Sequence, residues 1–255
     1  MKFQISIALA ILTLAPTFSP AANLLLNSGF ETFSVGNPNF WTYSQGDGPS
    51  SLQSNSSSPF TNINPTGAFS VLFTDGATTA VTPDLLQNLT VQTSGILNVA
   101  WDFRLNTKTG NPWSVQIDDS TSALLKFNMD AAGNFTVENS GGGSTTIMSP
   151  TANTWYQVQM ALDLDAHTLS GSITSQGLVS TAIGSQSWRL PVNNQISRVV
   201  ILDDSASAAG IAGNILFDNF AVDRTAFAAP AVVPEPSAML LLGLGGVFAA
   251  ARRRR

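Results

Sequence analysis

Residues 96–105, ILNVAWDFRL, decide the fold class of this chain. Apolar side chains recur at every second position from Leu97 through Trp101 to Leu105, and polar ones such as Asp102 and Arg104 stand mostly between them. Successive side chains of a strand point to opposite faces, so a period of two is the pattern of a half-buried β-strand. We therefore expect a strand with one apolar face turned into a core.

The same alternation occurs twice in residues 155–174, WYQVQMALDLDAHTLSGSIT. The first run places Tyr156 and every second residue up to Leu164 on one face, and the second returns with Leu169 and Ile173 on one face. Between the two runs stands DAHT, a short polar segment of the kind that turns a chain. The pattern predicts a β-hairpin.

Shorter segments of the same character lie along most of the chain, separated by clusters of Gly, Asn, Asp and Ser. They are AFSVLF at 68–73, WSVQI at 113–117, ALLKFNM at 123–129, NFTVE at 134–138, SRVVIL at 197–202 and NILFDNFAVD at 214–223. No segment of helix length between the two ends carries a period of 3.6. We expect an all-β fold, an antiparallel two-sheet jelly-roll sandwich, flanked by an N-terminal signal helix and a short C-terminal apolar helix.

Two stretches resemble known β-sandwich families. Residues 23–31, NLLLNSGFE, followed by Trp41, resemble the opening of carbohydrate-binding modules and galactose-binding-like domains. Residues 155–171, together with ILFDNFAVD at 215–223, look like concanavalin A-like lectins and laminin G-like domains. The two resemblances point to different families with a shared architecture, so they imply the jelly-roll shape and no particular ligand.

Composition limits the partners of the domain. The 255 residues are 44% hydrophobic and 11% charged, enough apolar material for one good core. Residues 23–234 contain six Lys and Arg against fifteen Asp and Glu, a formal charge of −9. Such a surface repels nucleic-acid phosphates, so we expect no nucleic-acid partner. The chain has no cysteine, which excludes disulfides, thiolate metal sites and a cysteine nucleophile.

The N-terminus has the organisation of a secretory signal peptide. Lys2 forms a short positive region, residues 3–15 are an apolar run, and SPAA at 19–22 supplies the small residues that signal peptidase requires. A buried helix of the domain would alternate polar and apolar faces, which this run hardly does. A retained anchor would need about 20 apolar residues. We predict a signal peptide over 1–22 and export of the chain.

The C-terminus, VVPEPSAMLLLGLGGVFAAARRRR, combines three parts. Pro234 and Pro236 favour extended backbone, so the Pro-Glu-Pro strip is suited to be read as an extended peptide. Residues 238–251 carry no charge and would reach about 21 Å as a helix, short of the roughly 30 Å hydrocarbon core. A segment of this length suits a temporary membrane anchor. Arg252, Arg253, Arg254 and Arg255 would stay in the cytoplasm by the positive-inside rule and act as a membrane stop.

This order of motif, apolar segment and basic cluster resembles the PEP-CTERM sorting signal of exported bacterial proteins. The resemblance covers about the last 24 residues and implies that Pro234, Glu235 and Pro236 are recognised by a membrane processing enzyme, the exosortase. It further implies transient inner-membrane anchoring followed by release to the cell surface or extracellular matrix. An ordinary amphipathic C-terminal helix is the alternative, but the segment has no polar face. We divide the chain into a signal peptide (1–22), a sandwich domain (23–226), a linker (227–233) and a sorting signal (234–255).

Catalytic patterns are scarce between the two ends. His167 is the only histidine and lies in the predicted hairpin turn, where a Ser-His-Asp triad is hard to assemble. Glycoside hydrolysis needs two carboxylates beside the scissile bond, and Glu31 and Glu138 are the only glutamates of the domain. The glycine run at 141–143 is not followed by an apolar helix, so it does not predict a phosphate site. We expect no enzymatic activity.

Aspartates near the predicted strand ends are candidate calcium ligands, because calcium takes hard oxygen donors. Each pair is equally explained as a turn in which Asp caps backbone amides. No cofactor is expected beyond this structural calcium. The candidates are Asp118, Asp119, Asp163, Asp165, Asp203 and Asp204.

Aromatic residues in polar loops are candidate platforms for a pyranose ring. Trp41, Tyr43, Trp113 and Trp188 stand in such loops, although aromatic side chains serve as core pillars just as often. The sequence thus predicts a non-catalytic surface or matrix protein that associates with carbohydrate. A secreted polysaccharide hydrolase and a protein-binding surface module are the alternatives.

Overall fold

A computed structural model describes residues 23–34, 37–44, 52–64, 67–74, 84–107, 113–119, 121–130, 132–191, 195–203 and 214–232. Within these ranges the secondary structure consists of β-strands without helices. The predicted signal peptide and the predicted sorting signal lie outside the described residues. No helix capable of crossing a membrane occurs in the described ranges.

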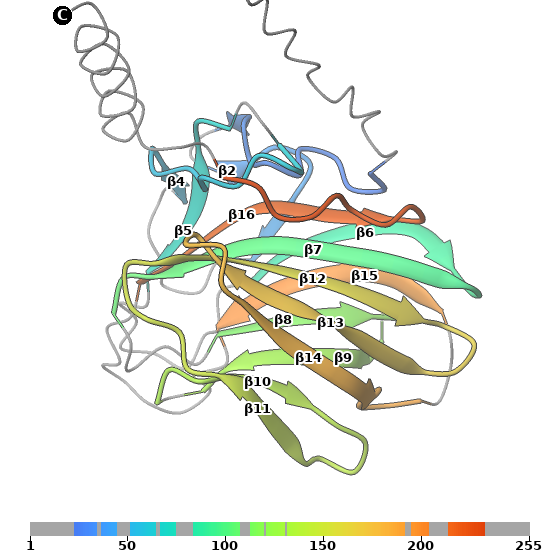
Figure 1. The fold of residues 1–255 in the computed structure, drawn as a ribbon. Coiled ribbons are helices and arrows are strands. Elements are labelled where there is room, and N and C mark those ends of the chain that lie inside the picture. Colours follow the sequence, from blue (N-terminus) through green and yellow to red (C-terminus); the bar gives the residue numbers. More distant parts are fainter. Residues whose placement is uncertain are drawn as a thin grey trace, which may run out of the picture.

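Two antiparallel sheets of seven strands face each other (Figure 1). We call the sheet with the order β14-β13-β12-β7-β16-β5-β4 the front sheet and the sheet with the order β11-β10-β9-β8-β15-β6-β3 the back sheet. The front strands are β4 (Gln53–Ser54), β5 (Ser70–Thr74), β7 (Ile96–Leu105), β12 (Trp155–Asp163), β13 (Thr168–Ser175), β14 (Ser180–Ser187) and β16 (Asn214–Asp223). The back strands are β3 (Thr42–Ser44), β6 (Asp84–Gln92), β8 (Trp113–Asp118), β9 (Ala123–Met129), β10 (Phe135–Glu138), β11 (Ser144–Met148) and β15 (Ile196–Asp203). A small ribbon of β1 (Phe33–Ser34) and β2 (Asn37–Pro38) lies apart from both sheets. The predicted jelly-roll sandwich is confirmed.

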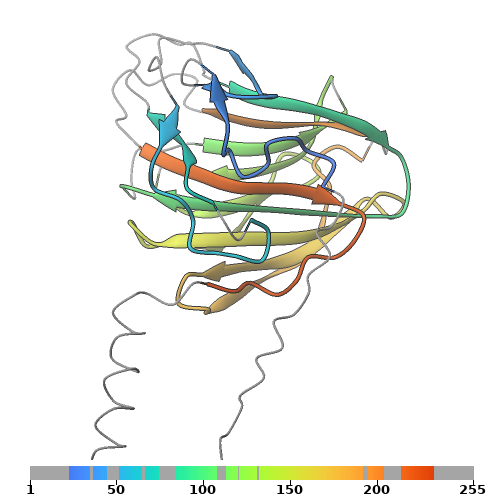
Figure 2. The same cartoon turned by 90° about the horizontal axis from the view of Figure 1, so that it is seen from above.

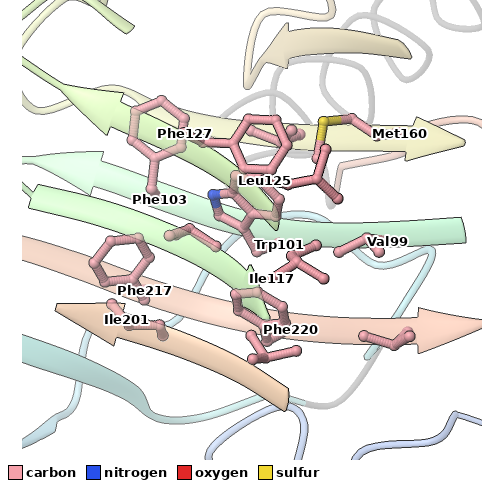
Figure 3. Packing of buried hydrophobic residues seen from close by; sticks show 14 of the residues in the cluster. Val99, Trp101, Phe103, Ile117, Leu125, Phe127, Met160, Ile201, Phe217 and Phe220 are labelled. Atoms are coloured by element: carbon pink, nitrogen blue, oxygen red, sulfur yellow. The ribbon is translucent and has the colours of Figure 1, made fainter. Parts of the chain in front are cut away.

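The core fills the space between the sheets (Figure 3). Trp101 of β7 stacks on Phe220 of β16 at a centroid distance of 5.5 Å and meets Phe127 of the back sheet at 5.3 Å. All three side chains are at most 1% exposed. Full burial of a large apolar side chain is worth about 1.5–3 kcal/mol. Because the domain has no disulfides, this aromatic layer supplies much of what holds the sheets together.

The strands predicted from alternation are present. The segment 96–105 is β7, and its Leu97, Val99, Trp101, Phe103 and Leu105 are all buried. The predicted hairpin is formed by β12 and β13, with His167 at a φ of 52° in the turn. Strands β6, β11 and β14 were not predicted, because β6 places the polar Gln87 at a buried position between Leu85 and Leu89, and β11 and β14 have few buried residues.

One prediction about β7 is wrong: its polar face is not solvated. Asp102 has no exposed surface and Asn98 is 8% exposed, and nine of the ten residues of β16 are likewise buried. Something other than the back sheet must therefore cover the outer face of these strands.

Candidate functional site

Two irregular segments cover the outer face of the front sheet. One is the loop 55–64 between β4 and β5, and the other is residues 224–232 after β16, which we call the strap. Figure 2 shows the chain turning back over the sheet after the end of β16. The loop and the strap meet each other, since the Thr61 amide donates to the Ala231 carbonyl at 2.8 Å and Phe60 forms a β-bridge with Val232.

The strap corrects the prediction of a linker at 227–233. Two side-chain amides, from Asn62 and Gln159, donate to the Ala228 carbonyl at 3.0 and 2.9 Å. Val232 also packs against an apolar cluster that contains Phe60 and Trp155. The strap is therefore part of the domain up to residue 232, which leaves one residue, Val233, before the Pro-Glu-Pro motif.

A buried pair of carboxyl groups lies beneath this cover. Asp218, Asp102 and Gln157 stand in register on β16, β7 and β12 and point away from the core. The Gln157 amide donates to Asp102 Oδ1 at 2.8 Å, and the Asn219 side chain donates to Asp102 Oδ2 at 2.6 Å. The backbone amides of Ser58 and Asn219 each donate to Asp218 at 2.7 Å.

Both carboxyl groups are harder to ionise than usual. Burial raises the pKa of Asp102 to about 7, although hydrogen bonds from Ser58, Asn219 and Gln157 oppose the rise. Burial also raises the pKa of Asp218 to about 8, and the charge of Asp102 adds to the rise. Neither carboxyl has exposed surface, so neither faces an external substrate.

An open pocket of about 750 Å³ lies beside the covered pair, at the end of the outer face where β7 ends and β12 begins. Its size falls within the range of known small-molecule sites. Six of the thirteen lining residues carry hydroxyl or amide side chains, and the others include one indole, one guanidinium and the apolar side chains of Pro59, Phe60 and Val232. The lining residues are Ser56, Ser57, Ser58, Pro59, Phe60, Thr61, Asn64, Gly67, Arg104, Trp155, Gln176, Gly177 and Val232.

Arg104 is the cation of this pocket. It lies in register with Trp155 on the neighbouring strand, and its guanidinium carbon is 5.5 Å from the centroid of that indole. Nη1 donates to Ser56 Oγ and Nη2 donates to Asn106 Oδ1, both at 3.1 Å, while the buried Nε has no hydrogen-bond partner. Within the described ranges Arg104 makes no ion pair, and burial lowers the pKa of its guanidinium.

The sugar-stacking prediction is wrong for three of its four residues. Trp41, Trp113 and Trp188 are 6%, 2% and 0% exposed, so their ring faces are closed to a ligand. Tyr43 is half-buried, packs on the same core and has a hydroxyl without a hydrogen-bond partner. Burial raises the pKa of this hydroxyl, with the nearby charge of Asp84 as the second cause. The alternative interpretation, that loop aromatics serve as core pillars, holds for the three tryptophans.

The contacts of these tryptophans explain their burial. Trp41 lies against Phe30 at a centroid distance of 5.1 Å, which closes the core beneath the N-terminal segment. The Trp188 indole donates to the Thr168 carbonyl at 3.1 Å and packs against His167. The polar residues that flank these tryptophans in the sequence therefore lie beside the core of the sandwich and do not indicate a ligand platform.

Four of the calcium candidates, Asp118, Asp119, Asp163 and Asp165, have other partners in the described part of the chain. Asp118 is 2% exposed and pairs with Arg198 at 2.6 Å, while burial raises the pKa of this carboxyl. Asp119 accepts backbone hydrogen bonds from the turn that follows it. Asp163 caps its own hairpin turn, and Asp165 accepts a hydrogen bond from the Gly95 amide at 2.9 Å.

Asp204 lies outside the described residues, and nothing is described of the Asp203 side chain. Among the described residues, His, Asp and Glu side chains form no group of three that could hold a metal ion.

The two glutamates of the domain also have structural partners. Glu31 accepts hydrogen bonds from the backbone amides of Ala68 and Phe69. Glu138 forms an ion pair with Arg189 at 2.7 Å. His167 lies in the hairpin turn and packs against Trp188.

The predicted sorting residues, Pro234, Glu235 and Pro236, and the predicted membrane stop, Arg252 to Arg255, lie outside the described residues.

The signal in the sequence that could have revealed the pocket was Arg104 itself. It is a cation near the end of a largely apolar strand, and the register that joins it to Trp155 is not visible in sequence.

Comparison with solved structures gives distant similarities. A peanut lectin bound to a 9mer peptide is 11% identical, with a TM-score of 0.47 over 78% of this chain and 96% of that chain. TmCBM61 in complex with β-1,4-galactotriose is 14% identical, with a TM-score of 0.39 over 80% and 99% of the two chains. A sialidase is 14% identical with a TM-score of 0.48 over 63% of this chain, which spans only 16% of the sialidase. These identities and scores say nothing about ligand or activity.

The search of curated proteins gave no match. Comparison with family models matched the PEP-CTERM protein-sorting motif at residues 232–255, which contain the Pro-Glu-Pro strip, the apolar segment and the four arginines. The chain therefore carries a PEP-CTERM sorting motif and is an exported protein with a C-terminal sorting signal.

Proposed function

We propose that this protein is a non-catalytic component of the cell surface or extracellular matrix that binds carbohydrate in the pocket on the outer face of the front sheet. The observation that carries the proposal is the composition of the pocket wall, where hydroxyl and amide groups of Ser56, Ser57, Thr61, Asn64 and Gln176 surround an opening of about 750 Å³. Such groups donate and accept hydrogen bonds as sugar hydroxyls do.

The surroundings of the carboxylates support binding over hydrolysis. A glycosidase places two carboxyl groups on either side of the bond that it cleaves. The described wall of the pocket contains no Asp or Glu, and the nearby Asp102 and Asp218 are sealed under the loop and the strap. A sugar in the pocket would meet hydrogen-bonding groups and one cation.

The sorting signal supports the proposed location. The family match to the PEP-CTERM motif indicates export, and the proposed next step is processing by an exosortase after signal peptidase has removed residues 1–22. Processing would release the domain from transient inner-membrane anchoring. A released domain with a sugar site would remain in a polysaccharide matrix by binding it.

A glycan-binding measurement tests the proposal. The full chain is titrated with a panel of soluble polysaccharides in affinity electrophoresis, alongside Ser57→Tyr, which narrows the pocket from its loop side. Wild type should be retarded by at least one polysaccharide and the variant much less, with no reducing ends released. Release of reducing ends would support the hydrolase alternative, and equal retardation of both proteins would place binding elsewhere.

A further inference from the structure

The ligand class of the pocket can be narrowed from its charge. Arg104 is permanently charged at any physiological pH, and an arginine in a protein is ordinarily matched by a carboxylate or phosphate. Within the described residues its hydrogen-bond partners are the neutral oxygens of Ser56 and Asn106. The cation is therefore partly desolvated without a compensating negative charge.

The geometry leaves donors available to a ligand. A guanidinium has five N–H groups, two on each Nη and one on Nε. One hydrogen of each Nη serves the bonds to Ser56 and Asn106, so each Nη keeps one further N–H. Packing against the Trp155 indole at 5.5 Å fixes the plane of the guanidinium. A fixed plane with one free N–H on each Nη suits the two oxygens of a carboxylate.

We propose that Arg104 binds the carboxylate of an acidic sugar, so that the pocket recognises polysaccharides containing uronate residues. This inference rests on the proposed carbohydrate-binding function. The ring would lie among the hydroxyl and amide groups of the loop 55–64 and of Gln176, with its carboxylate on the guanidinium.

The negative charge of the whole domain does not oppose such a site at physiological salt. The formal charge of residues 23–234 is −9, but charges separated by more than about 8 Å are largely screened at 0.15 M. The described wall of the pocket carries one cation and no anion, so a bound carboxylate would meet Arg104 directly, while Asp102 and Asp218 are buried behind the loop 55–64. The net charge should slow association at low salt and leave the affinity at 0.15 M governed by local contacts.

The experiment compares trigalacturonate with its methyl ester, which has the same rings and no charge. Isothermal titration calorimetry of the full chain at 0.15 M salt should give a roughly tenfold or greater preference for the acid, the worth of a charge-assisted hydrogen bond. Arg104→Gln should abolish the preference while the ester binds as before. Arg104→Lys should keep only part of it, because an ammonium lacks the planar fork.

Two controls keep the test decisive. Lys126→Gln makes the same change of charge on the back sheet and should leave the preference intact, and the melting temperatures of all variants establish that they are folded. Ser57→Tyr blocks the pocket without touching Arg104 and should weaken acid and ester together.

Each outcome separates the inference from the function on which it rests. Equal binding of acid and ester by wild type would overturn the acidic ligand and leave the carbohydrate site standing. No binding of any glycan would overturn both. The chain itself carries a second carboxylate close to the pocket in sequence. Glu235 follows Val232, a residue of the pocket wall, by three residues, which is about 10 Å of extended chain. Tighter binding of the acid to Glu235→Gln than to wild type, with the preference over the ester kept, would support Arg104 as a carboxylate site for which the tail competes. Absence of any preference for the acid in both wild type and Glu235→Gln would overturn the uronate proposal.

Discussion

The buried carboxyl pair makes the stability of the domain depend on pH in an unusual direction. Asp102 and Asp218 have pKa values of about 7 and 8 in the folded protein and ordinary values near 3.8 in the unfolded chain. Below pH 3.8 both states hold the protons. Between pH 4 and pH 7 the unfolded chain loses protons that the folded protein retains, so the free energy of unfolding falls as pH rises.

The magnitude follows from linkage. Each group that is protonated only in the folded state lowers the free energy of unfolding by about 1.4 kcal/mol per pH unit. From pH 5 to pH 7 the two groups together contribute a loss of up to about 5 kcal/mol. The loss ends above pH 8, where both carboxyls have ionised in the folded protein.

Asp102→Asn isolates one member of the pair. An asparagine cannot ionise, so between pH 5 and pH 7 the free energy of unfolding of the variant should fall less steeply with pH than that of wild type. The difference in slope should be about 1.4 kcal/mol per pH unit, whatever the absolute stability of the variant. Urea unfolding followed by tryptophan fluorescence at pH 5, 6, 7 and 8 measures the slope. Asp165→Asn, at the exposed hairpin turn, is the control and should keep the wild-type slope. Parallel slopes for wild type and Asp102→Asn would refute the account of the buried pair.

Three further changes test the packing. Gly171→Ala should destabilise the β12–β13 pair strongly, since a Cβ there would stand 2.1 Å from the Gln159 carbonyl oxygen; thermal unfolding measures the loss. Arg198→Ala leaves the Asp118 carboxylate buried without its cation and should lower the free energy of unfolding, measured in urea, by about 3 kcal/mol. Little change would show that the ion pair does not stabilise the domain. Phe60→Ala removes the side chain that joins the loop to the strap and should cost about 3 kcal/mol, with faster proteolysis inside 224–232; an unchanged digestion pattern would argue against a docked strap.

The alternation of apolar and polar residues predicted the strands whose side chains fill the core between the two sheets. It predicted little of the irregular structure outside the sheets. Trp101 and Val158 could be assigned to a core because every second neighbour is apolar. The burial of Asp102 and Gln157 could not, since it depends on the loop 55–64 and the strap. Those two segments carry no periodic pattern, and their contacts join residues more than 150 positions apart.

The candidate site shows the same division. The sorting motif was recognisable because its parts are contiguous in sequence, and the family comparison confirms it. The sugar site was sought at Trp41, Trp113 and Trp188 because their neighbours are polar, yet their rings point into the core. Arg104 and Trp155 meet only through the register of two strands that are 50 residues apart. Register is set by the whole sheet and leaves no local trace in the sequence.

The mass of the mature protein tests most directly whether the chain is exported and its C-terminal tail removed as a sorting signal. Wild type and a variant with Pro234, Glu235 and Pro236 all changed to Ala are expressed in a host that carries the processing enzyme, and the membrane, surface and medium fractions are analysed by intact mass. Wild type should appear at the surface or in the medium without residues 252–255, while the variant should retain Arg255 and stay with the membrane. A wild-type protein that keeps Arg255 in every fraction, as the variant does, would contradict the sorting function of the tail.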